Sequence, residues 1–191
     1  MMTTYKGDVK GDVIVRKGDD VSKLTSVGGW LDISAEGAQL PVLTSVGGWL
    51  DISAEGAQLP VLTSVGGGLD IRAEGAQLPV LQKVKGHDLP DAETARQRLI
   101  EVAKHALVPG ALYMEGWHNK SNGCGTAHCI AGWAVHLARE EGYALEAEVS
   151  QPAAGNILLG AEASALFYLN NDEARSALHK VLAEAGEKAP S

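Results

Sequence analysis

Apolar and polar residues alternate in a short segment that occurs three times in the first half of the chain. Residues 28–34 read Gly-Gly-Trp-Leu-Asp-Ile-Ser. Such alternation is typical of a β-strand that buries one face, because successive side chains of a strand point to opposite sides. The pattern predicts that Leu31 and Ile33 point inward. The outward residues are then Trp30, Asp32 and Ser34.

This strand segment belongs to a tandem repeat. The nineteen residues 24–42 recur unchanged at 43–61, and they recur at 62–80 with two differences, Gly68 and Arg72. A fixed period near twenty residues is typical of a solenoid, because each unit can bury its apolar face only against its neighbours. The repeat therefore predicts a short β-solenoid.

Each repeat also contains residues that turn the chain. Gly37 can take a positive φ and reverse the chain after the strand. Pro41 has no amide hydrogen, so the return leg that contains it cannot be a central strand. The simplest geometry has one strand per coil and an irregular or 3₁₀-like return leg.

The two ends of the solenoid depart from the repeat. Residues 11–23 look like a degenerate first coil. A shift of nineteen residues gives its inward side chains, Ile14, Val21 and Leu24. Residues 81–86 begin another coil and then stop. Lys83 and Lys85 would protect the strand edge exposed there, because charged side chains disfavour pairing between edges.

The second half of the chain predicts helices. From about residues 86–90 onward it is rich in Ala, Leu, Glu and His, and Pro90 with the acidic residues after it indicates a helix that ends before Pro109. Further helices are predicted at 127–141 with Gly142 as the stop, and at 151–159, 161–168 and 171–185. The fold class is therefore α+β in two domains, a β-solenoid at 1–88 and an α-helical domain at 89–191.

The repeat resembles a known family. Residues 40–52 read Leu-x-x-Leu-x-x-Val-Gly-Gly-x-Leu-x-Ile, which resembles the leucine-rich-repeat pattern. The letters LTSVGG resemble the repeats of receptor L-domain proteins, and the resemblance covers roughly residues 10–86. It implies a solenoid fold and binding of proteins or glycans, and it carries over no functional residue. The turn lacks the usual Asn or Cys and the coil is short, which favours a straight stack over a horseshoe.

Charge and composition narrow the classes of partner. The formal net charge is −8, from 24 acidic and 16 basic side chains. Nucleic-acid binding needs clustered Lys and Arg, so this balance predicts no direct nucleic-acid partner and suits a basic protein partner. No apolar run has the length of a signal peptide or a bilayer span, so we expect a cytoplasmic protein without a membrane partner. Two cysteines, Cys124 and Cys129, are too few for a disulfide framework.

Stacking in register would align identical outward side chains at about 4.8 Å, the spacing of neighbouring strands. The candidate binding residues on these ladders are Asp32, Asp51, Asp70, Glu36, Glu55, Glu74, Trp30 and Trp49. One interpretation is a solvated outer face whose like charges are screened by water. The other is a negative stripe that binds a basic surface with help from the tryptophans. The spacing of the aspartates is too sparse for a calcium loop.

Residues 117–134 form the one chemically dense segment, with two Cys, two His and two Trp. Thr126 is a candidate N-cap for the helix that follows, which would place His128 and Cys129 in its first turn, where the dipole favours a thiolate. Cys129, Trp133 and His136 would share one helix face. The letters CGTAHCIAGWA resemble a recurrent element of uncharacterised bacterial and phage proteins, and that resemblance implies no activity.

Four roles for this segment stay open. It can pack, with Cys129 as a buried hydrophobic residue. Cys129 can be a nucleophile with His118 or the distant His179 as its base, and a cysteine that opens a helix resembles the active-site segment of papain-like peptidases. A zinc ion can bind to a set of four side chains, His118, Cys124, His128 and Cys129. A disulfide between the cysteines is disfavoured in a reducing compartment.

The leading hypothesis is a non-enzymatic protein–protein interaction module that needs no cofactor and binds through the solenoid face, the helical domain or both. Near-identical repeats extend a surface without adding new chemistry, which favours this hypothesis. A phage-encoded inhibitor of a host complex is one specific form of it. The alternative is a cysteine-dependent hydrolase or transferase, or a zinc-binding domain, centred on residues 118–133.

Overall fold

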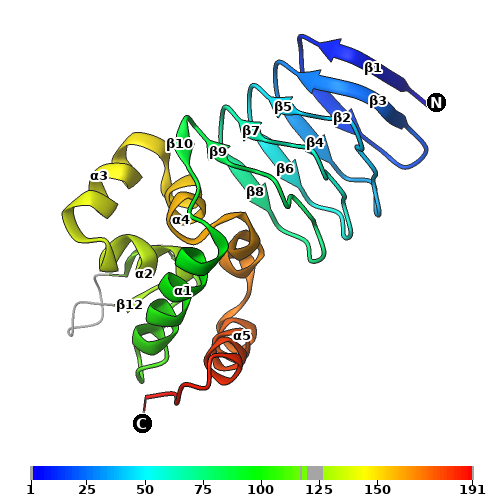
Figure 1. The fold of residues 1–191 in the computed structure, drawn as a ribbon. Coiled ribbons are helices and arrows are strands. Elements are labelled where there is room, and N and C mark those ends of the chain that lie inside the picture. The colour runs from blue at the N-terminus through cyan, green and yellow to red at the C-terminus, as the bar shows by residue number, and fades with distance from the viewer. Residues whose placement is uncertain (1, 117, 120–126, 191) are drawn as a thin grey trace. The chain divides into compact units, whose positions relative to one another are not determined.

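The structure is a computed structural model, and it describes residues 2–116, 118–119 and 127–190. The chain divides into two compact units, residues 1–89 and 90–191. The first is a β-solenoid and the second is helical, so the predicted α+β class is confirmed (Figure 1). Each unit is described by itself below.

The solenoid consists of short strands that form two sheets, whose strands are parallel except for the last pair of the first sheet. Its strands are β1 (Thr4–Val9), β2 (Val13–Val15), β3 (Asp20–Val27), β4 (Leu31–Ile33), β5 (Ser45–Val46), β6 (Leu50–Ile52), β7 (Ser64–Val65), β8 (Leu69–Ile71), β9 (Lys83–Val84) and β10 (His87–Asp88). Within the described residues, the first sheet has the order β1-β3-β5-β7-β9-β10 and the second β2-β4-β6-β8. Successive strands of each sheet come from successive coils, which stack as a straight column (Figure 1).

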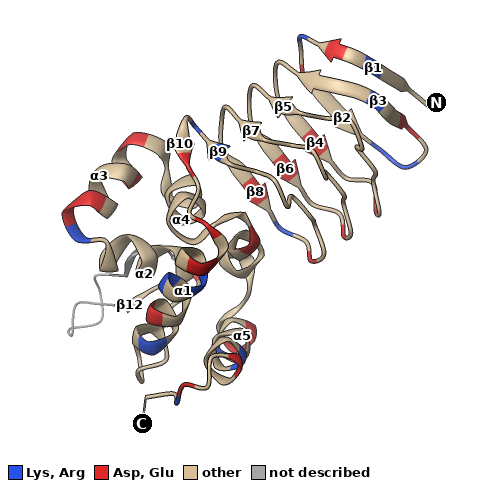
Figure 2. Ribbon diagram, in the orientation of Figure 1, with Lys and Arg blue, Asp and Glu red and all other residues tan. Residues whose placement is uncertain are grey.

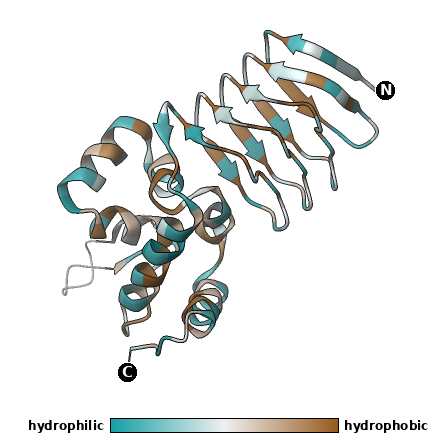
Figure 3. Cartoon of the chain, viewed as in Figure 1, coloured by the Kyte–Doolittle hydropathy of each residue, from teal (hydrophilic) through white to brown (hydrophobic). Residues whose placement is uncertain are grey.

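The solenoid core consists of ladders of one residue type. Leu31 pairs with Leu50 and Leu50 with Leu69, so identical side chains lie in register through the stack. Leu31 and Ile33 are buried, as predicted. Figure 3 shows the apolar segments at the same place in successive coils. Burial of such ladders stabilises the stack by about 25 cal/mol per Å² of apolar surface removed from water.

The return leg of each coil differs from the prediction, because it contains a second strand. Ser45–Val46 and Ser64–Val65 pair in parallel across coils, and Gln39 and Gln58 form a further isolated bridge. Pro41 lies in the turn before the strand, where Leu43 N donates to Leu40 O at 3.4 Å. Pro41 therefore lies outside the hydrogen-bonded strand pairing, so its lack of an N–H removes no bond from it. Ser45 and Val46, which follow, pair with the next coil.

The turn after each strand of the second sheet is as predicted, with Gly37 at φ 64°. The first coil is only partly as predicted, since Val21 and Leu24 are buried but Ile14 is not. It begins at β1, and β2 pairs with β4 so that Val15 is opposite Ile33, an offset of eighteen residues instead of nineteen. A shift of one residue moves every side chain to the other face. Val13 and Val15 are therefore buried, and Ile14 is 40% exposed instead of inward.

The solenoid ends in a hairpin. β10 runs antiparallel to β9, and the two residues between them, Lys85 and Gly86, have φ values of 52° and 83°. Positive φ at both central residues is typical of the tight turn whose twist suits a hairpin. β10 thus covers the edge of β9, and Lys83 forms an ion pair with Asp88. The sequence predicted that the last strand edge is exposed and protected by Lys83 and Lys85. In the structure, β10 covers this edge of β9.

The second unit consists of α1 (Ala92–Ala106), α2 (Ile130–Leu137), α3 (Arg139–Val149), α4 (Gln151–Leu159), the 3₁₀ helix η1 (Ala161–Tyr168) and α5 (Asn171–Glu184), with the short strands β11 (His118–Asn119) and β12 (Ala127–His128). Asp91 caps α1 by accepting from Thr94 N at 2.7 Å. Asn170 caps α5 in a capping box with Glu173. No helix of the described residues is long and apolar enough to cross a bilayer.

The predicted helix at 127–141 is wrong at both ends, because two helices replace it. α2 ends at Leu137 and α3 starts at Arg139, whose φ is 54°. Gly142 lies inside α3 and is buried. A Cβ there would lie 2.2 Å from the Val135 carbonyl oxygen, so glycine is needed for the close packing of α3 on α2. Gly142, which the sequence suggested as a helix stop, is instead a residue that close helix packing requires.

The solenoid gives a stability prediction at Gly47, whose N–H donates to Val27 O at 2.7 Å. A Cβ at this position would lie 2.4 Å from the Gly28 carbonyl oxygen of the preceding coil. Gly47→Ala should therefore destabilise the solenoid by about 1–3 kcal/mol, the usual cost of overpacking. Urea unfolding followed by circular dichroism measures this.

Gly11→Ala is the control, because a Cβ at Gly11 meets nothing within 4 Å. It should change the unfolding free energy little. Equal unfolding midpoints for the two variants would show that the coils do not approach as closely as described.

Candidate functional site

The outer face of the second sheet brings most of the predicted binding residues together. Strands β4, β6 and β8 pair in register, so their outward side chains form three columns. The columns are Trp30, Trp49 and Gly68; Asp32, Asp51 and Asp70; and Ser34, Ser53 and Arg72. Figure 2 shows the acidic band across the middle of β4, β6 and β8. We call this surface the Trp–Asp face.

The two tryptophans of this face differ in exposure. Trp30 is 63% exposed, whereas Trp49 is half-buried. A Cβ on Gly68 would lie 2.4 Å from Cζ3 of Trp49, so the Trp49 ring occupies the space above that glycine. Gly68 therefore makes room for the tryptophan ring of the preceding coil. The change from tryptophan to glycine in the third repeat removes one ring and also allows the Trp49 ring to pack there.

The aspartate column holds like charges close together. The guanidinium of Arg72 lies 2.7 Å from Oδ2 of Asp51 and 3.8 Å from Oδ2 of Asp70. Burial raises the pKa of Asp51, and the carboxylates of Asp70 and Asp32 raise it further, against the opposing effect of Arg72. Arg72 thus counteracts burial and the neighbouring carboxylates without cancelling their combined effect on the pKa of Asp51.

The glutamate ladder lies elsewhere on the coil. Glu36, Glu55 and Glu74 are exposed in the turns that follow the strands of the second sheet. Their backbone holds the turns together, since Gly37 N donates to Glu55 O at 2.8 Å and Gly56 N to Glu74 O at 3.1 Å. The glutamates thus belong to the turns, whereas the aspartates belong to the strands of the second sheet.

The Cys/His segment of the second unit is described in part. β11 and β12 pair antiparallel with His118 opposite His128. Cys124 and Thr126 lie outside the described residues, and His118 is described by its backbone alone. The proposed zinc set and the pairing of Cys129 with His118 therefore stay predictions. Among the described side chains, no group of three His, Cys, Asp or Glu could hold a metal ion.

Cys129, and not Thr126, is the N-cap of α2. Its Sγ accepts from Gly132 N at 3.3 Å, and the residue is 3% exposed. Burial raises the pKa of the thiol to about 11, although the amides of Gly132 and Ala131 act in the opposite direction. The helix start was expected to favour the thiolate, but loss of hydration outweighs it, and the thiol is protonated at neutral pH.

Three histidines surround one tryptophan beside this cysteine. The Trp133 ring centroid lies 5.8 Å from that of His105, 5.0 Å from that of His128 and 5.4 Å from that of His136. Trp133 Nε1 donates to Ala111 O at 2.9 Å, and the His136 ring contacts the Tyr143 hydroxyl at 2.9 Å. The contact of Trp133 with His136 agrees with the helix face that the sequence predicts them to share. The contact with His105 of α1 could not be predicted, because the two residues are far apart in the chain and no motif links them.

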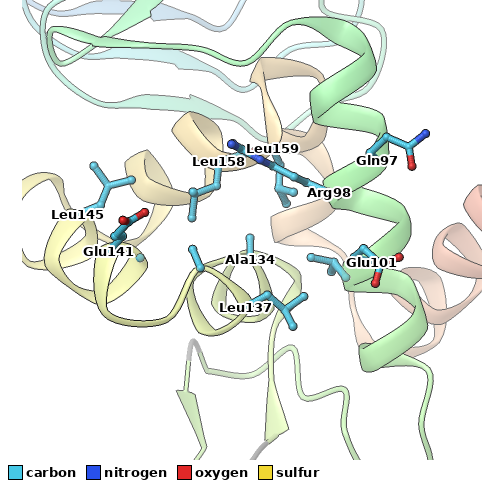
Figure 4. Close-up of a pocket in the computed structure, with 12 residues that line it drawn as sticks. Gln97, Arg98, Glu101, Ala134, Leu137, Glu141, Leu145, Leu158 and Leu159 are labelled. Carbon is cyan, nitrogen blue, oxygen red and sulfur yellow. The ribbon is translucent and has the colours of Figure 1, made fainter.

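The helical unit also contains a groove of about 540 Å³ between α1, α2, α3 and α4 (Figure 4). Its walls are apolar, with Val102, Leu137, Leu145, Leu158 and Leu159 among them. Arg98 also lines the groove and reaches from α1 to α4, where it donates to Leu158 O at 2.9 Å (Figure 4). Sequence reasoning missed this groove, because its lining comes from four helices and forms no linear motif.

Comparison of the chain with protein-family models, with curated proteins and with solved structures finds no match. The chemistry of the described surfaces therefore has to indicate the function of this chain.

Burial of Cys129 predicts slow alkylation. In a Cys124→Ser background at neutral pH, Cys129 of the folded protein should react with iodoacetamide far more slowly than a free thiol. Only the thiolate reacts, and a pKa of about 11 leaves very little thiolate at this pH. The rate should rise as the pH approaches that value, and unfolding in urea should restore full reactivity. Mass spectrometry of the alkylated protein measures both.

The same shift predicts a loss of stability in alkaline solution. The folded pKa is raised, so the thiol stabilises the fold fully below its unfolded pKa of about 8.5, and this contribution is lost as the pH rises through about 11. Cys129→Ala should remove this part of the pH dependence of the unfolding free energy. Fast alkylation of the folded protein at neutral pH would contradict both predictions and support the nucleophile.

Proposed function

We propose that this chain is a non-enzymatic protein-interaction module that binds a protein partner through the Trp–Asp face. The observation that carries the proposal is the 63% exposure of Trp30 beside the carboxylate column. Tryptophan is enriched among the residues that dominate binding energy at interfaces, and an exposed indole loses apolar contact with water when a partner covers it. Trp30 directly precedes β4, and its backbone N–H donates to Oδ1 of Asp12 at 2.8 Å.

The construction of the face supports the same function. Its side chains project from in-register strands whose backbones bond to the next coil, as where Leu31 N donates to Trp49 O at 2.8 Å. A surface that is ordered before binding loses little conformational entropy when it binds. The resemblance of the repeats to leucine-rich and receptor L-domain repeats accords with this function, since those families bind proteins or glycans.

The charge of the chain indicates the kind of partner. The net charge is −8, and the aspartate column adds local negative potential to the face. A basic protein surface would be attracted and oriented by this potential, whereas a phosphate backbone would be repelled. We place this activity in the cytoplasm, and a phage-encoded inhibitor of a host complex is one form that it can take.

We do not propose an enzyme centred on Cys129. A nucleophile needs an accessible thiolate, and this thiol is buried with a raised pKa. The packing role therefore accounts best for Cys129 and its helix.

A display selection tests the proposal. Peptides selected from a random library on the immobilised full chain should bind Trp30→Ser at least about tenfold more weakly, because the exposed indole is the centre of the interface. Isothermal titration calorimetry of the enriched peptides measures the change.

Val42→Ser is the control, since Val42 is 40% exposed at a turn of the same repeat. It should leave affinity unchanged. Enriched peptides that bind both variants as well as they bind the natural chain would refute a binding role for the Trp–Asp face.

A further inference from the structure

The third repeat carries its own arginine on the aspartate column. Arg72 N donates to Ile52 O at 2.9 Å, just as Ser53 N donates to Ile33 O at 3.1 Å, so the two residues occupy equivalent places one coil apart. From this place the Arg72 guanidinium reaches Asp51 of the preceding coil at 2.7 Å and Asp70 of its own coil at 3.8 Å. The face thus holds a guanidinium between two aspartates of neighbouring coils.

The equivalent place one coil earlier also lies between two aspartates and has no arginine of its own, and one of these aspartates, Asp51, already pairs with Arg72. It lies over Ser53 and is bounded by Asp32 and Asp51, which pair in register as Asp51 and Asp70 do. We call it the Ser53 niche. Serine is too short to fill the space that a guanidinium occupies over the next coil, where the backbone geometry is the same.

Hydrogen bonding leaves the carboxylate of Asp51, whose side chain is 33% exposed, only partly satisfied. Its Oδ2 accepts from Arg72, whereas its Oδ1 is buried and has no hydrogen-bond partner within the described part of the chain. A buried carboxylate oxygen without a donor is costly, and a charged donor is its best partner. A cation in the Ser53 niche would also relieve the repulsion between Asp32 and Asp51.

Trp30 adds an aromatic wall to one side of this surface. It precedes Asp32 by two residues and projects from the same face of the sheet, with its ring largely exposed. A guanidinium stacks on an indole and forms paired hydrogen bonds to carboxylates, whereas an ammonium ion is a compact, strongly hydrated charge. The arrangement therefore favours arginine over lysine.

We propose that the Ser53 niche binds an arginine side chain of the protein partner, between Asp32 and Asp51 and next to Trp30, and that Arg72 shows the geometry of this contact within the chain itself. This inference rests on the proposed function, because it names the chemistry that the Trp–Asp face recognises. Its occupant is a basic protein segment that carries an exposed arginine.

The test uses the full chain and a blocked Gly-Gly-Arg-Gly-Gly peptide, with lysine and citrulline peptides of the same length. Nuclear magnetic resonance should show shifts of the Asp32 and Asp51 carboxyl signals with the arginine peptide. The lysine and citrulline peptides should bind about tenfold or more weakly, because each loses the charged planar fork.

Two substitutions at equivalent places sharpen the test. Ser53→Arg copies the residue of the third repeat into the niche and should abolish binding of the arginine peptide. Arg72→Ser vacates the place between Asp51 and Asp70 and should at least double the amount of peptide bound at low occupancy. Gln39→Arg adds the same charge at an exposed position of the first repeat and should change affinity by less than about twofold, as expected of a screened surface charge.

Equal weakening by Ser53→Arg and Gln39→Arg would overturn the inference, because general charge would then explain the binding. Equal binding of the arginine and citrulline peptides would also overturn it. Circular dichroism of each variant shows whether the solenoid is intact. If binding of the library peptides depends on Trp30 but not on arginine or on Ser53, this inference fails and the proposed function stands. If substitution of Trp30 does not change peptide affinity, the proposed function itself fails.

Discussion

The solenoid depends on parallel stacking of its repeated coils in register. Each coil hydrogen-bonds its backbone to the next, as where Gly47 N donates to Val27 O at 2.7 Å, and the paired glycines bring the backbones too close for any side chain. Register puts leucine on leucine in the core and aspartate on aspartate outside. The first ladder lowers the free energy by burial and the second raises it by repulsion, so the surface chemistry is a consequence of the packing.

Repetition also explains why single departures from the repeat carry information. Gly68 and Arg72 are the two differences in the third repeat, and both act on the coil before them. Gly68 makes room for the ring of Trp49, and Arg72 contributes a cation to Asp51. A column of identical carboxylates needs a countercharge, and the third coil contains one of its own. That arginine also serves Asp51 of the second coil, whereas the first coil has no arginine at the equivalent place.

The helical unit follows a different principle, since small residues determine how its helices meet. Gly142 lets α3 approach the carbonyl of Val135, and a Cβ on Gly155 would lie 2.8 Å from the ring of Phe167. The same close packing encloses Cys129 and sets its protonation state. The dense run of cysteine, histidine and tryptophan residues thus belongs partly to a core, in which Trp133 contacts histidines from α1, α2 and β12.

The sequence by itself determined the solenoid, the helical second unit, and the inward and outward positions of each repeat, because these depend on periodicity within the chain. Only the tertiary structure decided the register of the first coil, the second strand of the return leg and the pKa of Cys129. Each depends on residues far apart in the chain: Val15 against Ile33, Ser45 against Ser64, and the shell that excludes water from the thiol. The reach of Arg72 to Asp51 is of this kind, since a spacing of 21 residues becomes a contact only when the coils stack.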